Sequence, residues 1–219
     1  GGAGAGGPEV YTMVLPLGDG VKCRRTKEEI EDWMVSCGCR GDTCLIALGG
    51  DAIQDLCGLV ASQYCMGIPM IAVPTTLLSM LECSGPRETQ LNAAEGKKII
   101  GCFVKPTMAF IDLRTLTKIN PRRLKAGMAY CIRWGIVYDR ELFELIDENA
   151  HMLLERDVSI LARLVDRAIR GRIASDDHAA SLKKVPSRGA GGAGGAAVPA
   201  ASGASLSLAV AAAAAAAVA

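Results

Sequence analysis

Residues 43–50, TCLIALGG, form an unbroken apolar run that ends in two adjacent glycines. An apolar run without polar alternation is typical of a strand that is covered on both faces of a parallel sheet. A helix is predicted to follow at about 52–65, and two further apolar strands at 68–74 and 108–113. Strands that alternate with helices predict a parallel sheet with right-handed crossovers, so this part of the chain is assigned to the α/β class.

A helix is also predicted ahead of this strand, within TKEEIEDWMVSCG at 26–38. Thr26 and Glu29 have the spacing of a capping box, and Gly38 suits the helix end.

Beyond residue 120 the apolar residues recur at helical spacing, and no further strand is predicted. Asn120 followed by Pro121 predicts a helix start, and Gly135 predicts its end. The expected layout is a partial α/β domain at 9–118 and a partial all-α domain at 119–182, between low-complexity disordered ends at 1–8 and 183–219. Since ligands of open α/β sheets bind beyond the carboxyl ends of the strands, the expected site is the cleft between the two parts.

Composition argues against several classes of partner. A net charge of +1 gives no bulk attraction to nucleic acid or to an anionic membrane. The nine cysteines include no C-x-x-C pair, which argues against a zinc ribbon and favours reduced thiols in an intracellular protein. The apolar C-terminal run is shorter than the ~20 residues that cross a bilayer, so no membrane anchor is expected. Because the chain begins with Gly1 and not Met, we expect a fragment or a processed chain.

The glycine turn has two interpretations. Gly49 and Gly50 lie between a predicted strand and a predicted helix, where backbone N–H groups can bind a phosphate. The pattern is weaker than a full G-x-G-x-x-G, and many tight turns of this kind bind nothing. Asp51 favours the second interpretation: an acid caps a helix and interacts with its dipole by ~0.3–1 kcal/mol, but it repels a pyrophosphate.

Other candidate ligand groups also have structural alternatives. Thr75 and Thr76 follow a predicted strand, where they can contact phosphate or ribose, or one of them can cap the next helix. Lys97 can bind a phosphate or lie solvated on the surface. The two histidines, His151 and His178, have no partners at metal-ligand spacing, so no assembled metal site is predicted.

Five segments occur in a diagnostic order: CRRTKEEIEDWM, DTCLIALGGDAIQDLCGLVAS, GIPMIAVPTTLLSM, GKKIIGCFVKPTMAFIDL and PRRLKAGMAYCIRWG. Together they resemble 3-dehydroquinate synthase, particularly the form in multifunctional shikimate-pathway proteins, over about residues 9–180. Glycerol-dehydrogenase-like enzymes share the glycine turn and the P-T-T, but they lack the helix that matches the last segment.

The resemblance implies an NAD-binding α/β domain, a helical domain, and a cleft between them that holds NAD and a divalent metal, zinc or cobalt. It also implies the conversion of 3-deoxy-D-arabino-heptulosonate 7-phosphate, a phosphorylated sugar acid, to 3-dehydroquinate and phosphate in aromatic amino acid biosynthesis. The family enzyme is a carbon–oxygen lyase that eliminates phosphate.

Carried over residue by residue, the resemblance covers the nucleotide site in part. The family turn G-G-G-V-I-G-D is matched at Gly49, Gly50 and Asp55, but its third glycine is Asp51 and its fourth is Gln54. The other matches are the P-T-T threonines and the lysine of G-K-N. The cofactor-binding residues implied by the resemblance are Gly49, Gly50, Asp55, Thr75, Thr76 and Lys97.

The departures fall on the residues implied for the chemistry. The substrate-holding arginine of R-G-I-P is Met66. In D-S-S-x-G-G-K-T, read here as ECSGPRET, the aspartate is Glu82 and the lysine is Glu88. In A-E-V-I-K the metal-binding glutamate is Tyr130 and the lysine is Arg133, and a neutral phenol is a poor zinc ligand.

The family's two other metal ligands are histidines of a later G-H-x-x-G-H segment, and the chain leaves the family pattern near Ala180. The family's first strands, which also contact NAD, have no counterpart upstream. The prediction is therefore a truncated domain without the metal site, with no catalytic residue assigned, and with NAD binding weakened by Asp51.

Three interpretations stay open: an inactive relative with no function beyond its fold, a non-catalytic module that forms a homodimer or pairs with an intact synthase subunit, and an active enzyme with an altered metal site. In the last case Glu82, Tyr130 and Arg133 would have to support the metal. Cytoplasm and plastid suit the pathway equally.

Overall fold

The computed structural model describes residues 8–83, 85, 87–183 and 210–213. The elements that bear on the sheet, in chain order, are β1 (Tyr11–Val14), η1 (Asp19–Val21), α1 (Arg24–Ser36), β2 (Leu45–Gly49), α2 (Asp51–Gln63), η2 (Tyr64–Met66), β3 (Met70–Pro74), α3 (Leu77–Glu82), β4 (Arg87–Ala93), β5 (Gly96–Val104), β6 (Met108–Ala109) and β7 (Val210–Ala213). The helices between β6 and β7 are α4 (Arg114–Thr117), α5 (Pro121–Tyr138), α6 (Arg140–Glu148), α7 (Ala150–Leu154) and α8 (Val158–Lys183).

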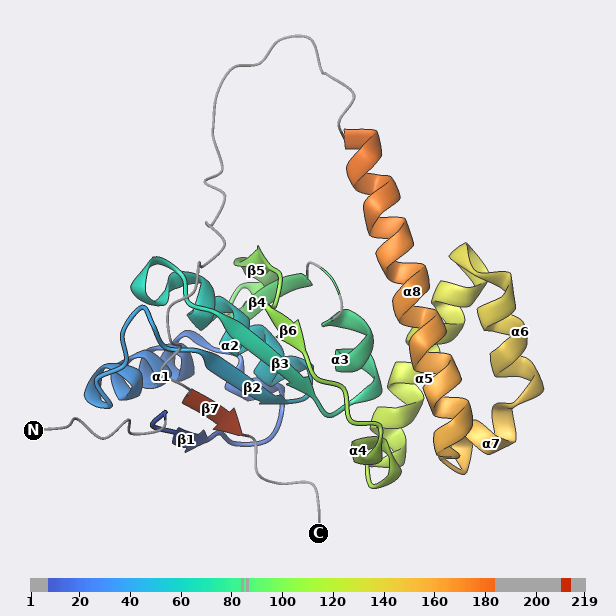
Figure 1. Cartoon of the computed structure of the whole chain (residues 1–219), viewed down its shortest axis with the longest axis horizontal. Coiled ribbons are helices and arrows are strands. Elements are labelled where there is room, and N and C mark those ends of the chain that lie inside the picture. The colour runs from blue at the N-terminus through green and yellow to red at the C-terminus, as the bar shows by residue number, and fades with distance from the viewer. Residues whose placement is uncertain (1–7, 84, 86, 184–209, 214–219) are drawn as a thin grey trace, which may run out of the picture.

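Among the described residues, the main sheet has five strands in the order β1-β7-β2-β3-β6, and all of its pairings are parallel (Figure 1). β2 and β3 pair along their whole length, from Leu45 with Met70 to Gly49 with Pro74. The predicted α/β character and the parallel sheet are therefore confirmed. Of the strand predicted at 108–113, only Met108 and Ala109 are paired.

α1 begins earlier than predicted. Cys23 occupies the N-cap position without a side-chain cap, so the predicted capping box of Thr26 and Glu29 is wrong. The hydroxyl of Thr26 lies 3.3 Å from the Cys23 sulfur instead. The predicted role of Gly38 is confirmed, because this residue has a φ of 74° directly after the helix end.

An antiparallel hairpin, β4–β5, was not predicted. It packs against α2, which lies between the hairpin and strands β2 and β3. The burial of β4 alternates from Arg87 onward, which places Arg87 and Thr89 inside and Glu88 outside. The alternating pattern of RETQLNA was the signal in the sequence, but charged and amide residues hid it.

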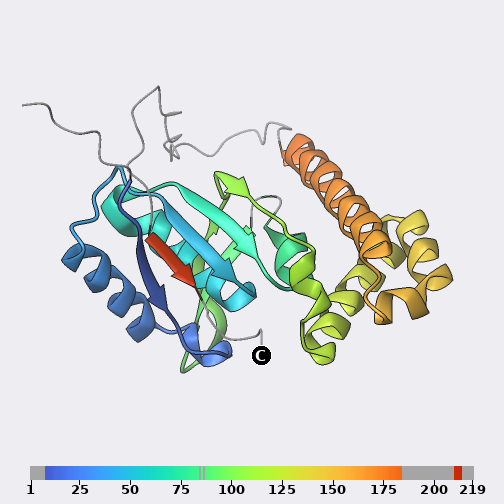
Figure 2. The ribbon, with the colours of Figure 1, turned by 60° about the horizontal axis from the view of Figure 1, so that its bottom comes forward.

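Residues 114–183 form helices (Figure 2). The predicted start of α5 is confirmed: Asn120 Oδ1 accepts a 2.9 Å hydrogen bond from the Arg122 amide, and Pro121 is the first helical residue. The predicted end at Gly135 is wrong, because α5 continues to Tyr138. A Cβ on Gly135 would lie 2.9 Å from the Phe143 backbone nitrogen, so this glycine permits the close packing of α6.

Two buried apolar clusters form the core of the part of the chain that the structure describes. One joins the sheet to α1 and α2, and the other joins α5, α6, α7 and α8. The second cluster also contains Leu77, Met80 and Leu81 of α3, so the helical core includes residues that precede the boundary predicted between 118 and 119. No helix within the described ranges is long and apolar enough to cross a membrane.

The C-terminal segment requires a correction. Residues 183–219 were predicted to be a disordered tail, but Val210–Ala213 form β7, inside the main sheet. Lys183 belongs to α8. The rest of the predicted tail and residues 1–7 lie outside the described residues.

Candidate nucleotide site and the adjoining cavity

A pocket of about 470 Å³ opens at the carboxyl ends of β2 and β3. Five of the six residues implied for cofactor binding line this pocket: Gly49, Gly50, Thr75, Thr76 and Lys97. Arg123 and Ala126 of α5 complete the wall on the helical side. The pocket therefore lies where open α/β sheets bind ligands, between the sheet and the first long helix that follows it.

The two glycines allow the turn to pack tightly. A Cβ on Gly49 would lie 2.8 Å from the Cβ of Ile53, and a Cβ on Gly50 would lie 3.0 Å from Thr76 Cγ2. Both glycines thus have a packing role that does not depend on a ligand. The turn nevertheless leads into the N-terminus of α2, where backbone N–H groups without helical partners can bind a phosphate.

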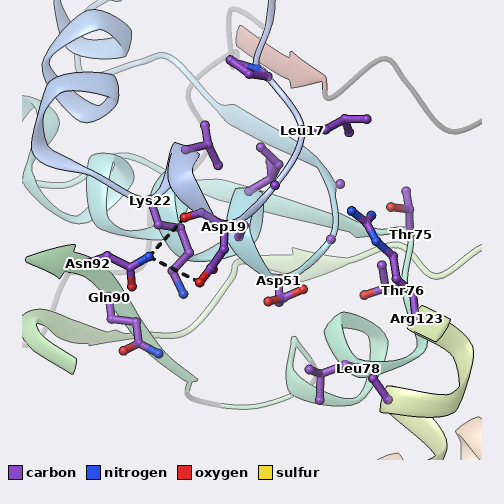
Figure 3. A pocket seen from close by; sticks show the side chains of 18 of the residues that line it. Leu17, Asp19, Lys22, Asp51, Thr75, Thr76, Leu78, Gln90, Asn92 and Arg123 are labelled. Atoms are coloured by element: carbon purple, nitrogen blue, oxygen red, sulfur yellow. Dashed lines mark hydrogen bonds between the residues drawn. The ribbon is translucent and has the colours of Figure 1, made fainter. Parts of the chain in front are cut away.

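Asp51 lies in this pocket, but it does not cap α2 as predicted. Gly50 holds the N-cap position, and Asp51 is the first helical residue without a side-chain cap bond. Its charge still suits the helix dipole. Asp19 places a second carboxylate in the same pocket (Figure 3).

Lys97 is partly neutralised by Asp19. Its ammonium nitrogen lies 2.8 Å from Asp19 Oδ2. The Asn92 amide donates to the Asp19 carbonyl oxygen at 3.1 Å (Figure 3). The hydrogen bond from Lys97 lowers the pKa of Asp19, and the same bond raises the pKa of Lys97. A phosphate at this position would compete with Asp19 for the lysine.

The two threonines have different roles. Thr76 is the N-cap of α3, where its hydroxyl accepts from the Ser79 amide at 3.2 Å in a capping box. Thr75 lines the pocket, and its amide donates to the Gly49 carbonyl at 3.0 Å. In Figure 3 the guanidinium of Arg123 lies beside both threonines. Arg123 was not predicted as a site residue, although it lies two residues after Pro121, where the helix was predicted to start.

Asp55, the sixth implied residue, does not line this pocket. It is 3% exposed and binds two buried cations: Lys22 Nζ donates to Oδ2 at 2.5 Å, and Arg87 Nη2 donates to Oδ1. Both carboxylate oxygens are therefore engaged inside the protein. Neither Lys22 nor Arg87 was predicted as a site residue. The alternating pattern of β4, which places Arg87 on the inward face, was the available signal.

Gln54 stands where the family turn has its fourth glycine, and it is fully buried. Its amide donates to the carbonyl oxygens of Ala47 at 2.7 Å and Gly49 at 3.3 Å. The larger side chain is thus accommodated by bonds to the end of β2, while its own Oε1 has no hydrogen-bond partner among the residues that the structure describes.

A second cavity, of about 500 Å³, adjoins the pocket, and the two share Lys22, Asp51, Leu78 and Gln90. Four of the substituted family positions meet in it: Glu82, Glu88, Tyr130 and Arg133. Met66 does not join them. It is 95% exposed in η2, ahead of β3, whereas both cavities lie beyond the strand's other end.

The chemistry of the second cavity does not suit a divalent metal. Burial raises the pKa of the Tyr130 phenol, so the neutral form is favoured. Its ring packs against Trp134, and the Arg133 guanidinium lies 5.2 Å from the ring centre. Across the described residues no three His, Cys, Asp or Glu side chains converge on a common point, so this donor set does not fit zinc or cobalt.

Comparison with known proteins shows similarity across most of the chain. Residues 12–126 match the family described as 3-dehydroquinate synthase N-terminal. The 3-dehydroquinate synthase of Pseudoalteromonas translucida is 38% identical over 167 residues, which are 75% of this chain and 47% of that protein. The pentafunctional AROM polypeptide of Schizosaccharomyces japonicus is 39% identical over 148 residues, 68% of this chain and 9% of the polypeptide.

Solved structures agree in fold. ValA, a 2-epi-5-epi-valiolone synthase from Streptomyces hygroscopicus solved with NAD+ and Zn2+, is 26% identical with a TM-score of 0.70 over 78% of this chain and 48% of that one. A 2-deoxy-scyllo-inosose synthase solved with carbaglucose-6-phosphate, NAD+ and Co2+ has a TM-score of 0.67 at 23% identity, over 72% of this chain and 43% of the other. The chain spans about half the length of these synthases.

Proposed function

Because this chain belongs to the 3-dehydroquinate synthase family, we propose that it is a catalytically degenerate domain of that family, derived from a shikimate-pathway enzyme. In this proposal it keeps the strand–turn–helix of the nucleotide site but does not catalyse the family reaction by itself. Helices α5 and α8 form one wall of a site whose chemistry has changed.

The observation that carries the proposal is Tyr130. It stands where the family motif has its metal-binding glutamate, and it lines the second cavity as a half-buried phenol beside Trp134 and Arg133. A neutral phenol beside an indole and a guanidinium is a poor ligand for a divalent cation. Because the metal site does not fit, no catalytic step is assigned to it.

Charge in the second cavity supports the same conclusion. Glu88 replaces the family lysine, and Glu82 and Asp51 add further carboxylates to the lining. The cations Lys22 and Arg87 are engaged with Asp55. Arg133 and Arg172 also line this cavity, so a phosphorylated sugar acid would meet repulsion at the Glu88 position alone, where the family motif has a lysine.

NAD fits the first pocket only in part. The turn amides, the Thr75 hydroxyl and the cations Lys97 and Arg123 would hold its phosphates, and bound NAD would supply a hydride acceptor. Asp51 and Asp19 oppose this binding, and Asp55 has no free oxygen for a ribose hydroxyl. We propose that the chain binds NAD with weakened affinity, and we assign no reaction step to bound NAD.

The test combines calorimetric titration of NAD into the full chain with an assay for phosphate release from 3-deoxy-D-arabino-heptulosonate 7-phosphate. We expect weak or undetectable NAD binding and no turnover with added zinc or cobalt, under conditions in which the Pseudoalteromonas synthase is active. Metal-dependent turnover would overturn the degenerate assignment and favour an active enzyme with an altered site.

A second candidate, an assembly module, has support from one surface. Ile136, Val137 and Tyr138, at the end of α5, are 68%, 59% and 65% exposed, and adjacent exposed apolar side chains favour a protein interface. The proposed partner is a second copy or an intact synthase subunit. Light scattering of the chain alone and mixed with an intact synthase tests this candidate; a monomer in both samples would contradict it.

A further inference from the structure

Within the described residues, β1 and β2 are never paired with each other. Between them lies β7, parallel to both (Figures 1 and 2). Val210 is level with Tyr11 on one side and Leu45 on the other, and Ala213 is level with Val14 and Leu48. The positions of β1 and β2 thus leave a space that is one strand wide.

This space has consequences for β1. Among the described strands, β7 is the one partner of β1. Without β7, β1 would have no ladder hydrogen bonds, and β2 would present an unpaired edge in the interior of the sheet. Unpaired strand edges are templates for association with other chains.

The tail can reach this position. Residues 184–209 separate the end of α8 from β7, and this length exceeds the dozen or so residues that a parallel crossover needs. The segment Val210–Ala213 contains no polar or charged residue, which is compatible with a strand that has neighbours on both sides.

We propose that the position between β1 and β2 is a strand-acceptor site, and that the chain's own segment Val210–Ala213 occupies it. When the site is occupied, β1 is paired and keeps one wall of the nucleotide pocket in place. Just beyond β1, Pro16–Asp19 line that pocket, and Lys22, a few residues further, binds Asp55. This inference goes beyond the proposed function, because it concerns completion of the sheet and holds whether or not NAD binds.

The tail strand is a weak occupant. Alanine is depleted in strands, whereas interior parallel strands are usually rich in Val, Ile and Leu. Three of the four residues of β7 are alanine. The site is therefore expected to exchange its occupant more readily than an ordinary interior strand does.

The first experiment is hydrogen exchange on the full chain carrying Ala212→Pro. An interior strand uses each N–H in one of its two ladders, so proline removes a bond and disfavours the strand. We expect the amides of β1 to exchange at least tenfold faster than in the parent chain, while β3 is unchanged. Ala217→Pro, outside β7, is the control and should leave β1 unaffected. Equal exchange of β1 in both variants would overturn the proposal.

A second experiment reports on register and does not require a disrupted strand. Thr12 is level with Ala211, so Thr12→Cys with Ala211→Cys should form a disulfide within one chain on mild oxidation, identified by peptide mapping. The control pair is Thr12→Cys with Ala217→Cys. A disulfide between two chains would assign the strand to a second copy. If the Thr12–Ala211 disulfide does not form, Val210–Ala213 is excluded as the occupant. Either result overturns the proposal.

Discussion

At the scale of single residues, Asp51 and Asp55 show that a partial match to the family turn does not preserve its chemistry. Asp51 adds a carboxylate to the pocket that the turn amides face. Asp55 matches the family turn by position, yet Lys22 and Arg87 engage both of its oxygens. A residue that matches a motif therefore has its family role only if its polar atoms remain available.

Asp51→Asn is expected to strengthen NAD binding. It removes a like charge near the pyrophosphate while keeping a side chain of the same size, and a gain of about 1.4 kcal/mol corresponds to about tenfold tighter binding. Asp32→Asn, at an exposed position on α1, makes the same charge change away from the pocket and should have no effect. Calorimetric titration compares the two, and equal affinities would show that Asp51 does not limit binding.

Glu82 is expected to make stability depend on pH. Burial raises the pKa of its carboxyl above 4.5, more strongly than the nearby Arg87 lowers it. The folded state then holds this proton more tightly than the unfolded state, so the contribution is full below about 4.5 and is lost as pH rises through the raised pKa.

Glu82→Gln should therefore reduce the fall in the free energy of unfolding between about pH 4.3 and neutral pH. Glu29→Gln on the exposed side of α1 is the control. Urea unfolding at a series of pH values measures both; parallel curves for Glu82→Gln and the parent chain would contradict the prediction.

At the scale of elements, α5 shows the difference between a local signal and a packing requirement. Its start follows from the Asn120 cap and from Pro121, which act within one turn. By local pattern, Gly135 predicts a helix end. In the folded chain Gly135 lies inside α5, where the α6 backbone approaches it.

Gly135→Ala is expected to destabilise the protein by about 1–3 kcal/mol, because the added methyl overlaps the backbone of Phe143. Gly171→Ala is the matched control within α8. There the methyl would lie 3.4 Å from Trp134 Nε1, and alanine favours a helix interior by about 1 kcal/mol. Thermal or urea unfolding should therefore show opposite changes. A stabilised Gly135→Ala variant would mean that α6 packs less closely than described.

At the scale of the whole molecule, the buried ion network joins parts of the chain that are distant in sequence. Lys22 follows η1, Asp55 lies in α2, and Arg87 begins the β4–β5 hairpin. This network connects the pocket wall, the central helix and the hairpin. Breaking a buried pair leaves an uncompensated charge, whereas an exposed pair contributes little.

Arg87→Ala is accordingly expected to lower the free energy of unfolding by about 3–5 kcal/mol. Arg25→Ala removes an exposed pair with Glu29 on α1 and should change it by less than about 1 kcal/mol. Urea unfolding distinguishes the two, and similar losses would mean that the Arg87 pair has no special structural role.

Local and periodic features were predictable from the sequence alone. The buried strands β2 and β3, the helix after the glycine turn, the cap of α5 and the family follow from apolar runs, cap residues and motif order within short stretches. These features depend on neighbours in the chain, so they need no knowledge of distant contacts.

Only the tertiary structure decided which candidate groups meet. It brought Thr75, Lys97 and Arg123 to one pocket, removed Asp55 from that pocket, and placed Met66 beyond the opposite strand end. It also placed β7 between β1 and β2. The physical reason is that pairing of strands and burial of charges depend on contacts between residues far apart in the chain, which local pattern does not encode.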